Sequence, residues 1–210
     1  MTFPEIYEMQ AKAILQAAIE LEREGKERAE IKIMMPLVTM AGEFKFLRGV
    51  VDSSASELFK ELGSRVEYKV GTMIETPRAA LTASEIADFS DFFSFGTNDL
   101  TQTTFGFSRD DVEGKFIPKY IELGLLPQSP FDSVDVAGVG RLVRIAVEDG
   151  RRVKPGLEVG VCGEHGGDPK SIAFFNEVGL NYVSCSAYRV PVARLAAAQA
   201  TLSRSTSATA

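Results

Sequence analysis

Cysteine and histidine are scarce in this chain of 210 residues, which contains two cysteines, Cys162 and Cys185, and one histidine, His165. Two cysteines are too few for a disulfide framework, so the composition favours a reducing compartment. Cysteine and histidine also never recur at the spacing of zinc ligands, so the sequence gives no support for a zinc site. Cys185 is expected to be a packing residue.

Long apolar runs and basic clusters are also missing from the sequence. No run approaches the roughly 20 apolar residues that span a bilayer, and residues 1–8 do not resemble a secretory signal. The formal net charge of −6 argues against a nucleic-acid or anionic-membrane partner. We therefore predict a cytoplasmic protein, or an organellar one if a transit peptide precedes residue 1.

The chain does contain a regular alternation of strand-like and helix-like segments. Strands are predicted over 31–38, 66–74, 92–95, 157–162 and 182–185. Helices are predicted over 6–21, over 44–62 with an interruption near Ser53-Ser54, after Thr76-Pro77, over 139–150, over 169–178 after an Asp168 cap, and from Pro191 onwards. The stretch 103–137 has no sustained period and is predicted to be a long loop. Residues 1–202 are assigned to one domain, and residues 203–210 to a disordered tail.

Strands separated by helices indicate a parallel α/β architecture whose strands are apolar on both faces. Periodicity does not distinguish an open, doubly wound sheet from a (β/α)8 TIM-type barrel. The absence of G-x-G-x-x-G after the first strand argues against dinucleotide binding. A complete barrel needs about 250 residues, so a whole barrel does not fit this chain comfortably.

Polar residues follow several predicted strands, and this is where parallel α/β folds place their chemistry. Glu75 and Asp99 end two successive strands, so their carboxylates could together bind magnesium and leave positions for a substrate. Each carboxylate could instead cap the following helix, although Thr76 already supplies a cap after Glu75.

The turn Gly96–Asp99 could direct backbone amides toward an anion, and Arg78 and Arg109 could bind a carboxylate or a phosphate. An ordinary turn and solvated surface arginines explain the same residues. Cys162 is flanked by a glycine-rich turn and a helix start, which could lower the pKa of its thiol and expose it, although most free cysteines are inert packing residues. For His165, a phosphohistidine is conceivable, but a loop histidine that orients its neighbours is the simpler interpretation.

Four segments taken together resemble the phosphoenolpyruvate-utilising enzymes. They are VGTMIETPRAAL (70–81), FFSFGTNDLTQTTFGFSRDD (92–111), GVCGEHGGDPKS (160–171) and LNYVSCSAYRVPVARLAAAQA (180–200). GEHGGDP, the SRDD sequence and YRVPVARLAAAQA are most similar to the dikinase branch of the family. The resemblance implies an incomplete TIM-type barrel that retains about strands 4–8.

The resemblance also implies roles for individual residues. Glu75 and Asp99 match magnesium ligands, and Cys162 matches the acid/base at the methyl carbon of pyruvate. Substrate-binding positions are implied for Glu75, Gly96, Thr97, Asn98, Asp99, Arg109 and Tyr182. By the same alignment, His165 is not the phosphorylated histidine.

The implied reaction converts ATP, pyruvate and phosphate into AMP, phosphoenolpyruvate and diphosphate through an enzyme phosphohistidine and the enolate of pyruvate. The implied partners are pyruvate or phosphoenolpyruvate, a phosphohistidine domain and an ATP-binding domain, neither of which is recognisable in this chain, and a second copy in a homodimer. Two substrate-binding arginines of the family's first three strands have no counterpart before Ile31. Alternatives are a truncated, non-catalytic binding or regulatory subunit, and an enzyme of the phosphoenolpyruvate synthase or enzyme I type. An open sheet also predicts that the isolated chain is poorly stable.

Overall fold

A five-stranded parallel sheet forms the centre of the fold in the computed structural model, which describes residues 2–207 and the side chains of residues 2–203. The strands are β1 (Ile31–Met35), β2 (Tyr68–Ile74), β3 (Phe92–Gly96), β4 (Glu158–Cys162) and β5 (Tyr182–Val183). They pair in chain order and every pair is parallel. The predicted parallel α/β class is confirmed, with β5 shorter than expected.

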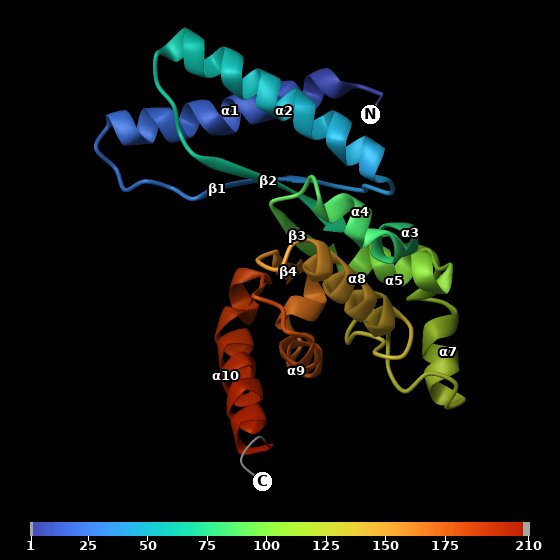
Figure 1. Ribbon diagram of the computed structural model, residues 1–210. Coiled ribbons are helices and arrows are strands. Elements are labelled where there is room, and N and C mark those ends of the chain that lie inside the picture. The colour runs from blue at the N-terminus through green and yellow to red at the C-terminus, as the bar shows by residue number, and fades with distance from the viewer. Residues whose placement is uncertain (1, 208–210) are drawn as a thin grey trace.

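Helices connect the strands on the outside of the sheet. They are α1 (Pro4–Arg23), α2 (Ala41–Leu62), α3 (Pro77–Leu81), α4 (Ala83–Ala87), α5 (Thr97–Phe105), α6 (Arg109–Val112), α7 (Phe116–Glu122), α8 (Val139–Val153), α9 (Pro169–Val178) and α10 (Val190–Ser207). Figure 1 shows α1 and α2 lying together beside β1 and β2, and α10 packed against α9 near the opposite end of the chain. No helix within residues 2–207 is long and apolar enough to cross a membrane.

The two faces of the sheet have different side chains because successive residues of a strand point in opposite directions. One face is buried beneath the helices, with fully buried Val70, Phe93 and Val161. On the other face, Lys32 of β1 and Glu158 of β4 form an ion pair of 2.7 Å. The Lys32 ammonium also lies 5.7 Å from the centre of the Tyr182 ring. This second face, called the inner face below, is therefore polar at the amino ends of the strands.

Two helices are longer than the sequence predicted. The predicted break near Ser53-Ser54 is wrong, because the Ser54 hydroxyl donates to the carbonyl of Val50 at 2.7 Å and leaves the helix continuous. Helix α8 continues through Gly150, whose missing side chain makes room for Leu157; a Cβ atom there would approach Leu157 Cδ2 to 2.9 Å. These two residues have a packing role that their low helix propensity conceals.

The prediction of one long loop over 103–137 is wrong. This stretch carries the end of α5 and the short helices α6 and α7. Its aromatic residues form a small core of their own. The ring of Phe107 lies 5.1 Å from the rings of both Phe105 and Phe116, and Phe131 is fully buried beside them. Contacts of this kind stabilise short helices that have no sustained period.

The last helix also departs from the prediction. Helix α10 continues to Ser207, so residues 203–207, assigned to a disordered tail, are helical in the structure, whereas residues 208–210 lie outside the described part. The alanine-rich part of α10 ends at residue 200, and the helix continues from it into a serine-rich stretch whose own propensity is lower.

Asp168 caps helix α9, as predicted, and it also holds the preceding loop. Its carboxylate accepts hydrogen bonds from the backbone N–H of Ser171 at 2.8 Å, the Ser171 hydroxyl at 2.6 Å and the Ser133 hydroxyl at 2.8 Å. Burial raises the pKa of this carboxyl, but these hydrogen bonds outweigh burial and hold the pKa below its ordinary value.

Replacement of Asp168 by alanine is expected to lower the free energy of unfolding by about 1–2 kcal/mol at pH 7. A lowered pKa contributes stability that is complete above the pKa of the unfolded chain and is lost as the pH falls through the folded pKa. The difference between wild type and D168A should therefore shrink in acid, as measured by denaturant unfolding at several pH values. The exposed Asp132 supplies the control; an equal loss in D132A would contradict the capping argument.

Candidate functional site

The carboxyl ends of β2, β3 and β4 bring the chain's central polar residues together. Gly96 of β3 pairs with Cys162 of β4, and Glu75 directly follows β2. A Cβ atom on Gly96 would overlap the Oε2 atom of Glu75. The Glu75 carboxylate therefore occupies the space at the end of β3 that a side chain at position 96 would fill. Three of the predicted site residues thus meet at one edge of the sheet.

Glu75 is only 4% exposed, and the end of β1 supplies its hydrogen-bond donor. The backbone N–H of Leu37 donates to Glu75 Oε1 at 2.7 Å. Leu37 has φ 50°, a left-handed conformation that is uncommon for a residue other than glycine. Burial raises the pKa of Glu75, and the nearby Asp99 carboxyl raises it further.

Asp99 lies in the first turn of α5, where Gln102 Nε2 donates to its Oδ1 at 3.5 Å. Asp99 follows Gly96, the residue that Glu75 lies against, by three positions, and its carboxyl raises the pKa of Glu75. A divalent cation would offset the cost of ionising both groups. Among the described residues no group of three or more His, Cys, Asp or Glu is arranged for a metal. Two carboxylates are hard oxygen donors of the type that magnesium accepts while it keeps positions for water and substrate oxygens.

Cys162 is a partly buried thiol beside these carboxylates. Its sulfur lies 3.7 Å from the carbonyl oxygen of Phe95. Burial raises the pKa of the thiol, and the negative charges of Glu75, Asp99 and Glu164 add to this effect, against a hydrogen bond with Ser94. The lowered pKa that the glycine-rich turn and the following helix suggested is therefore wrong, and the group is a protonated thiol at neutral pH.

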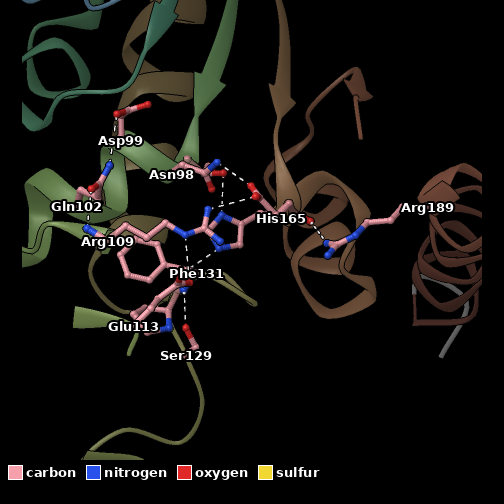
Figure 2. A network of polar contacts seen from close by, with 12 residues as sticks. Asn98, Asp99, Gln102, Arg109, Glu113, Ser129, Phe131, His165 and Arg189 are labelled. Carbon is pink, nitrogen blue, oxygen red and sulfur yellow. Dashed lines mark hydrogen bonds and ion pairs between the residues drawn. The ribbon is translucent and has the colours of Figure 1, made fainter. Parts of the chain in front are cut away.

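Arg109, at the start of α6, is fixed by two carboxylates and an aromatic ring (Figure 2). Its Nη1 donates to Glu164 Oε1 at 3.1 Å and its Nε to Glu113 Oε1 at 3.0 Å. The guanidinium carbon lies 5.3 Å from the centre of the Phe131 ring. Asn98 contacts the Glu164 carboxylate as well, since its Nδ2 donates to Oε2 at 2.6 Å. Although burial opposes them, these bonds lower the pKa of Glu164.

Thr97 and His165 form a buried connection below this network. Both side chains are fully buried; His165 Nε2 lies 3.0 Å from the carbonyl oxygen of Pro130, and Nδ1 lies 2.7 Å from the Thr97 hydroxyl. Because a carbonyl only accepts, Nε2 carries the proton and the Thr97 hydroxyl donates to Nδ1. Burial lowers the pKa of His165, so the ring is neutral. It orients its neighbours, and only the backbone of Thr97 remains for a ligand.

Tyr182 lies below the strand ends, and Arg78 contacts the loop that follows β1. Tyr182 pairs with Gly160, which places its ring on the inner face one level below Cys162. A Cβ atom on Gly160 would overlap that ring, so Tyr182 packs across β4. Arg78 donates from Nη1 to the carbonyl of Thr39 at 2.7 Å, and this bond braces the connection between β1 and α2.

Sequence reasoning missed three contributors to the site: Leu37, Glu113 and Glu164. The position of Glu164, two residues after Cys162 in the glycine-rich turn, was a signal that could have identified it. Glu113 was recognisable as the residue one helical turn after Arg109. The backbone conformation of Leu37 has no comparable signal in the sequence.

Acidic groups, a thiol and an arginine at the carboxyl ends of parallel strands are typical of an α/β enzyme that binds a small anionic substrate. The sequence model for "PEP-utilising enzyme, PEP-binding domain" matches residues 1–202. The chain belongs to this family of phosphoenolpyruvate-utilising enzymes, as the motifs predicted.

Within the family, the chain is similar to pyruvate, phosphate dikinases. It is 55% identical over 202 residues to the enzyme of Clostridium symbiosum, covering 96% of this chain and 23% of the relative. It is 55% identical over 199 residues to the chloroplastic enzyme of Mesembryanthemum crystallinum, covering 95% and 21%. For the Rhizobium meliloti enzyme the identity is 54% over 202 residues, covering 96% and 22%. The chain thus spans less than a quarter of the length of these relatives.

One solved structure, a citrate lyase from Burkholderia xenovorans, has a similar fold, with a TM-score of 0.54 and 15% sequence identity. The similarity covers 85% of this chain and 52% of that one. At this identity the likeness concerns the fold alone. It agrees with the predicted incomplete barrel, since the five strands correspond to about half of the larger chain.

Proposed function

We propose that this chain provides the magnesium-binding and proton-transferring part of a pyruvate, phosphate dikinase site. The observation that carries the proposal is the meeting of Glu75, Gly96 and Cys162 at adjacent strand ends. The dikinase relatives support it, because they match 95% or more of this chain. In the proposed reaction, a phosphoryl group passes reversibly between an enzyme phosphohistidine and the enolate of pyruvate. The comparisons favour neither a non-catalytic subunit nor a synthase or enzyme I type.

Glu75 and Asp99 would hold Mg²⁺ from one side and leave its remaining positions to substrate oxygens. When bound, the cation supplies stabilisation of negative charge on those oxygens. The protein's own contribution is the geometry: Leu37 orients Glu75 through its backbone N–H, and the first turn of α5 carries Asp99.

Cys162 would transfer the proton at the methyl carbon. In the direction of pyruvate formation, the S–H bond breaks and a C–H bond forms at the terminal carbon of the enolate. In the reverse direction, the thiolate removes the same proton from the methyl group of pyruvate. The raised pKa of this thiol keeps the proton on sulfur until a basic carbon is present.

Arg109 and Asn98 would bind the anionic groups of the substrate through N–H donors. The proposal places the phosphohistidine and ATP-binding domains outside residues 1–210, and homodimerisation of the whole enzyme stays a prediction. Tyr182 would support the site from the level below, through its packing across Gly160.

The test is calorimetric titration of the full gene product that contains these residues with phosphoenolpyruvate, with and without Mg²⁺. We expect binding that depends on Mg²⁺ and that weakens on the order of 100-fold in Asp99→Asn, which lacks one anionic ligand. The control, Asp110→Asn, changes an exposed carboxylate nearby on α6 and should bind as the wild type does. Equally tight binding without Mg²⁺, or an unchanged D99N, would refute the proposed role of the carboxylates.

A further inference from the structure

Glu164 is the residue through which four segments of the site contact one another. Its two carboxylate oxygens accept from Asn98 at 2.6 Å and from Arg109 at 3.1 Å. Its backbone carbonyl accepts from Arg189 Nη1 at 3.0 Å, as Figure 2 shows at the right of the network. These donors follow β3, α5 and β5, whereas Glu164 itself follows β4.

The orientation of each partner follows from the chemistry of the carboxylate, which only accepts hydrogen bonds. Asn98 must direct its NH₂ group toward Glu164, which leaves its Oδ1 buried and without a hydrogen-bond partner among the described residues. A buried, unpaired acceptor is unfavourable, so this orientation is held by the strong, charge-assisted bond on the other side of the amide. Only one N–H of the Asn98 amide is bound to Glu164, so its second N–H contacts no acceptor among the described residues and remains for an anionic ligand.

The same carboxylate restricts the Arg109 side chain. Glu164 and Glu113 together occupy two of its five N–H donors, Nη1 and Nε, while the ring of Phe131 lies near the guanidinium plane. The other N–H groups, including both of Nη2, contact no acceptor within the described residues. An arginine side chain that is already held in this way loses little rotamer entropy when its guanidinium binds a carboxylate or a phosphate.

We infer that Glu164 is a positioning residue for the anionic substrate, because one carboxylate fixes both Arg109 and Asn98 with donors left for the ligand. This inference rests on the proposed function and adds a residue outside the implied substrate-binding set. The opposite role is also physically conceivable: Glu164 could compete with the anion for Arg109 and repel it. The two roles predict opposite changes in affinity when the carboxylate is removed.

The experiment measures the Kd of phosphoenolpyruvate at saturating Mg²⁺, and the Kd of Mg²⁺ alone, in the full gene product. We expect Glu164→Ala to weaken phosphoenolpyruvate binding by about 10–100-fold, the range of lost supporting contacts. Glu164→Gln keeps the shape and one acceptor oxygen, so its loss should be smaller, about 3–10-fold. Because Mg²⁺ contacts other carboxylates, its own Kd should stay within about twofold, whereas a collapse of the site would change both constants.

The matched control is Glu113→Gln, which removes the other carboxylate on Arg109, an exposed i,i+4 pair of little energetic weight; binding should change less than in E164Q. Unchanged or tighter phosphoenolpyruvate binding in E164Q overturns the inference, even where E164A fails to fold. Wild-type protein that binds no phosphoenolpyruvate overturns the proposed function, and the inference with it. The two failures are therefore distinguishable.

Discussion

Replacing Cys162 by alanine should slow the exchange of pyruvate methyl protons with solvent by on the order of 10²–10⁴-fold, the contribution of a positioned general acid or base. In the proposed reaction this thiol carries the proton; Cys162 pairs with Gly96 on the neighbouring strand, and the Glu75 charge raises the pKa of the thiol. The exchange is followed by the loss of the methyl signal of pyruvate in deuterated solvent, with the full gene product, Mg²⁺ and the other substrates present.

The chain supplies its own control in its second cysteine. Cys185 packs against Ile172, Ala193 and Ala196, away from the carboxylates. Cys185→Ala should therefore keep the exchange rate of the wild type. Substrate affinity should change little in Cys162→Ala, because in the proposed reaction the thiol acts on the reacting carbon and holds neither anionic group. Full exchange in C162A would show that another group carries the proton.

Much of the fold was predictable because its signals are local. Thr76 and Asp168 both cap a helix that begins with proline, and Gly179 ends α9 with φ 85°. Such residues act within one turn of the chain, so their sequence neighbours reveal them. The parallel sheet followed from apolar runs alternating with these helices.

The failures of prediction come from contacts between distant parts of the chain. The core around Phe107 and Phe131 stabilises α6 and α7, and no local period indicates it. The hydroxyl of Ser54 is satisfied inside α2, where composition suggested a break. In each case a tertiary contact or a side-chain hydrogen bond outweighs the local propensity.

The candidate site shows the same division. Glu75, Asp99 and Cys162 were predicted because parallel strands bring their carboxyl ends to one edge. Glu164 contacts Arg109 and Asn98, which precede it by 55 and 66 positions in the chain. Its carboxylate can therefore make these hydrogen bonds only in the folded chain, where β3, β4 and α6 lie together. Sequence spacing identified the residues at the strand ends but not the residue that connects them.

Gly96→Ala should disrupt the proposed metal site without removing either carboxylate. The added methyl group would overlap Glu75 Oε2 and lie 2.8 Å from Met73 Cε and 2.9 Å from Glu75 Cβ. Overpacking of this kind costs about 1–3 kcal/mol of stability. Since Glu75 must move to relieve it, Mg²⁺ affinity should fall by on the order of 10–100-fold. Thermal unfolding and Mg²⁺ titration measure the two effects separately.

The backbone at Gly96 makes this substitution informative. Its φ of −91° is accessible to alanine, so any loss comes from the crowded carboxylate and not from a strained main chain. Gly49→Ala is the matched control: it lies inside α2 with no atom within 4 Å of an added Cβ and should stabilise the fold by about 0.5–1 kcal/mol. If G96A kept wild-type Mg²⁺ affinity, Glu75 could not be held against this strand end as a metal ligand. A selective loss of Mg²⁺ affinity in G96A would instead show that the space beside Gly96 holds the Glu75 carboxylate in the position from which it binds the cation.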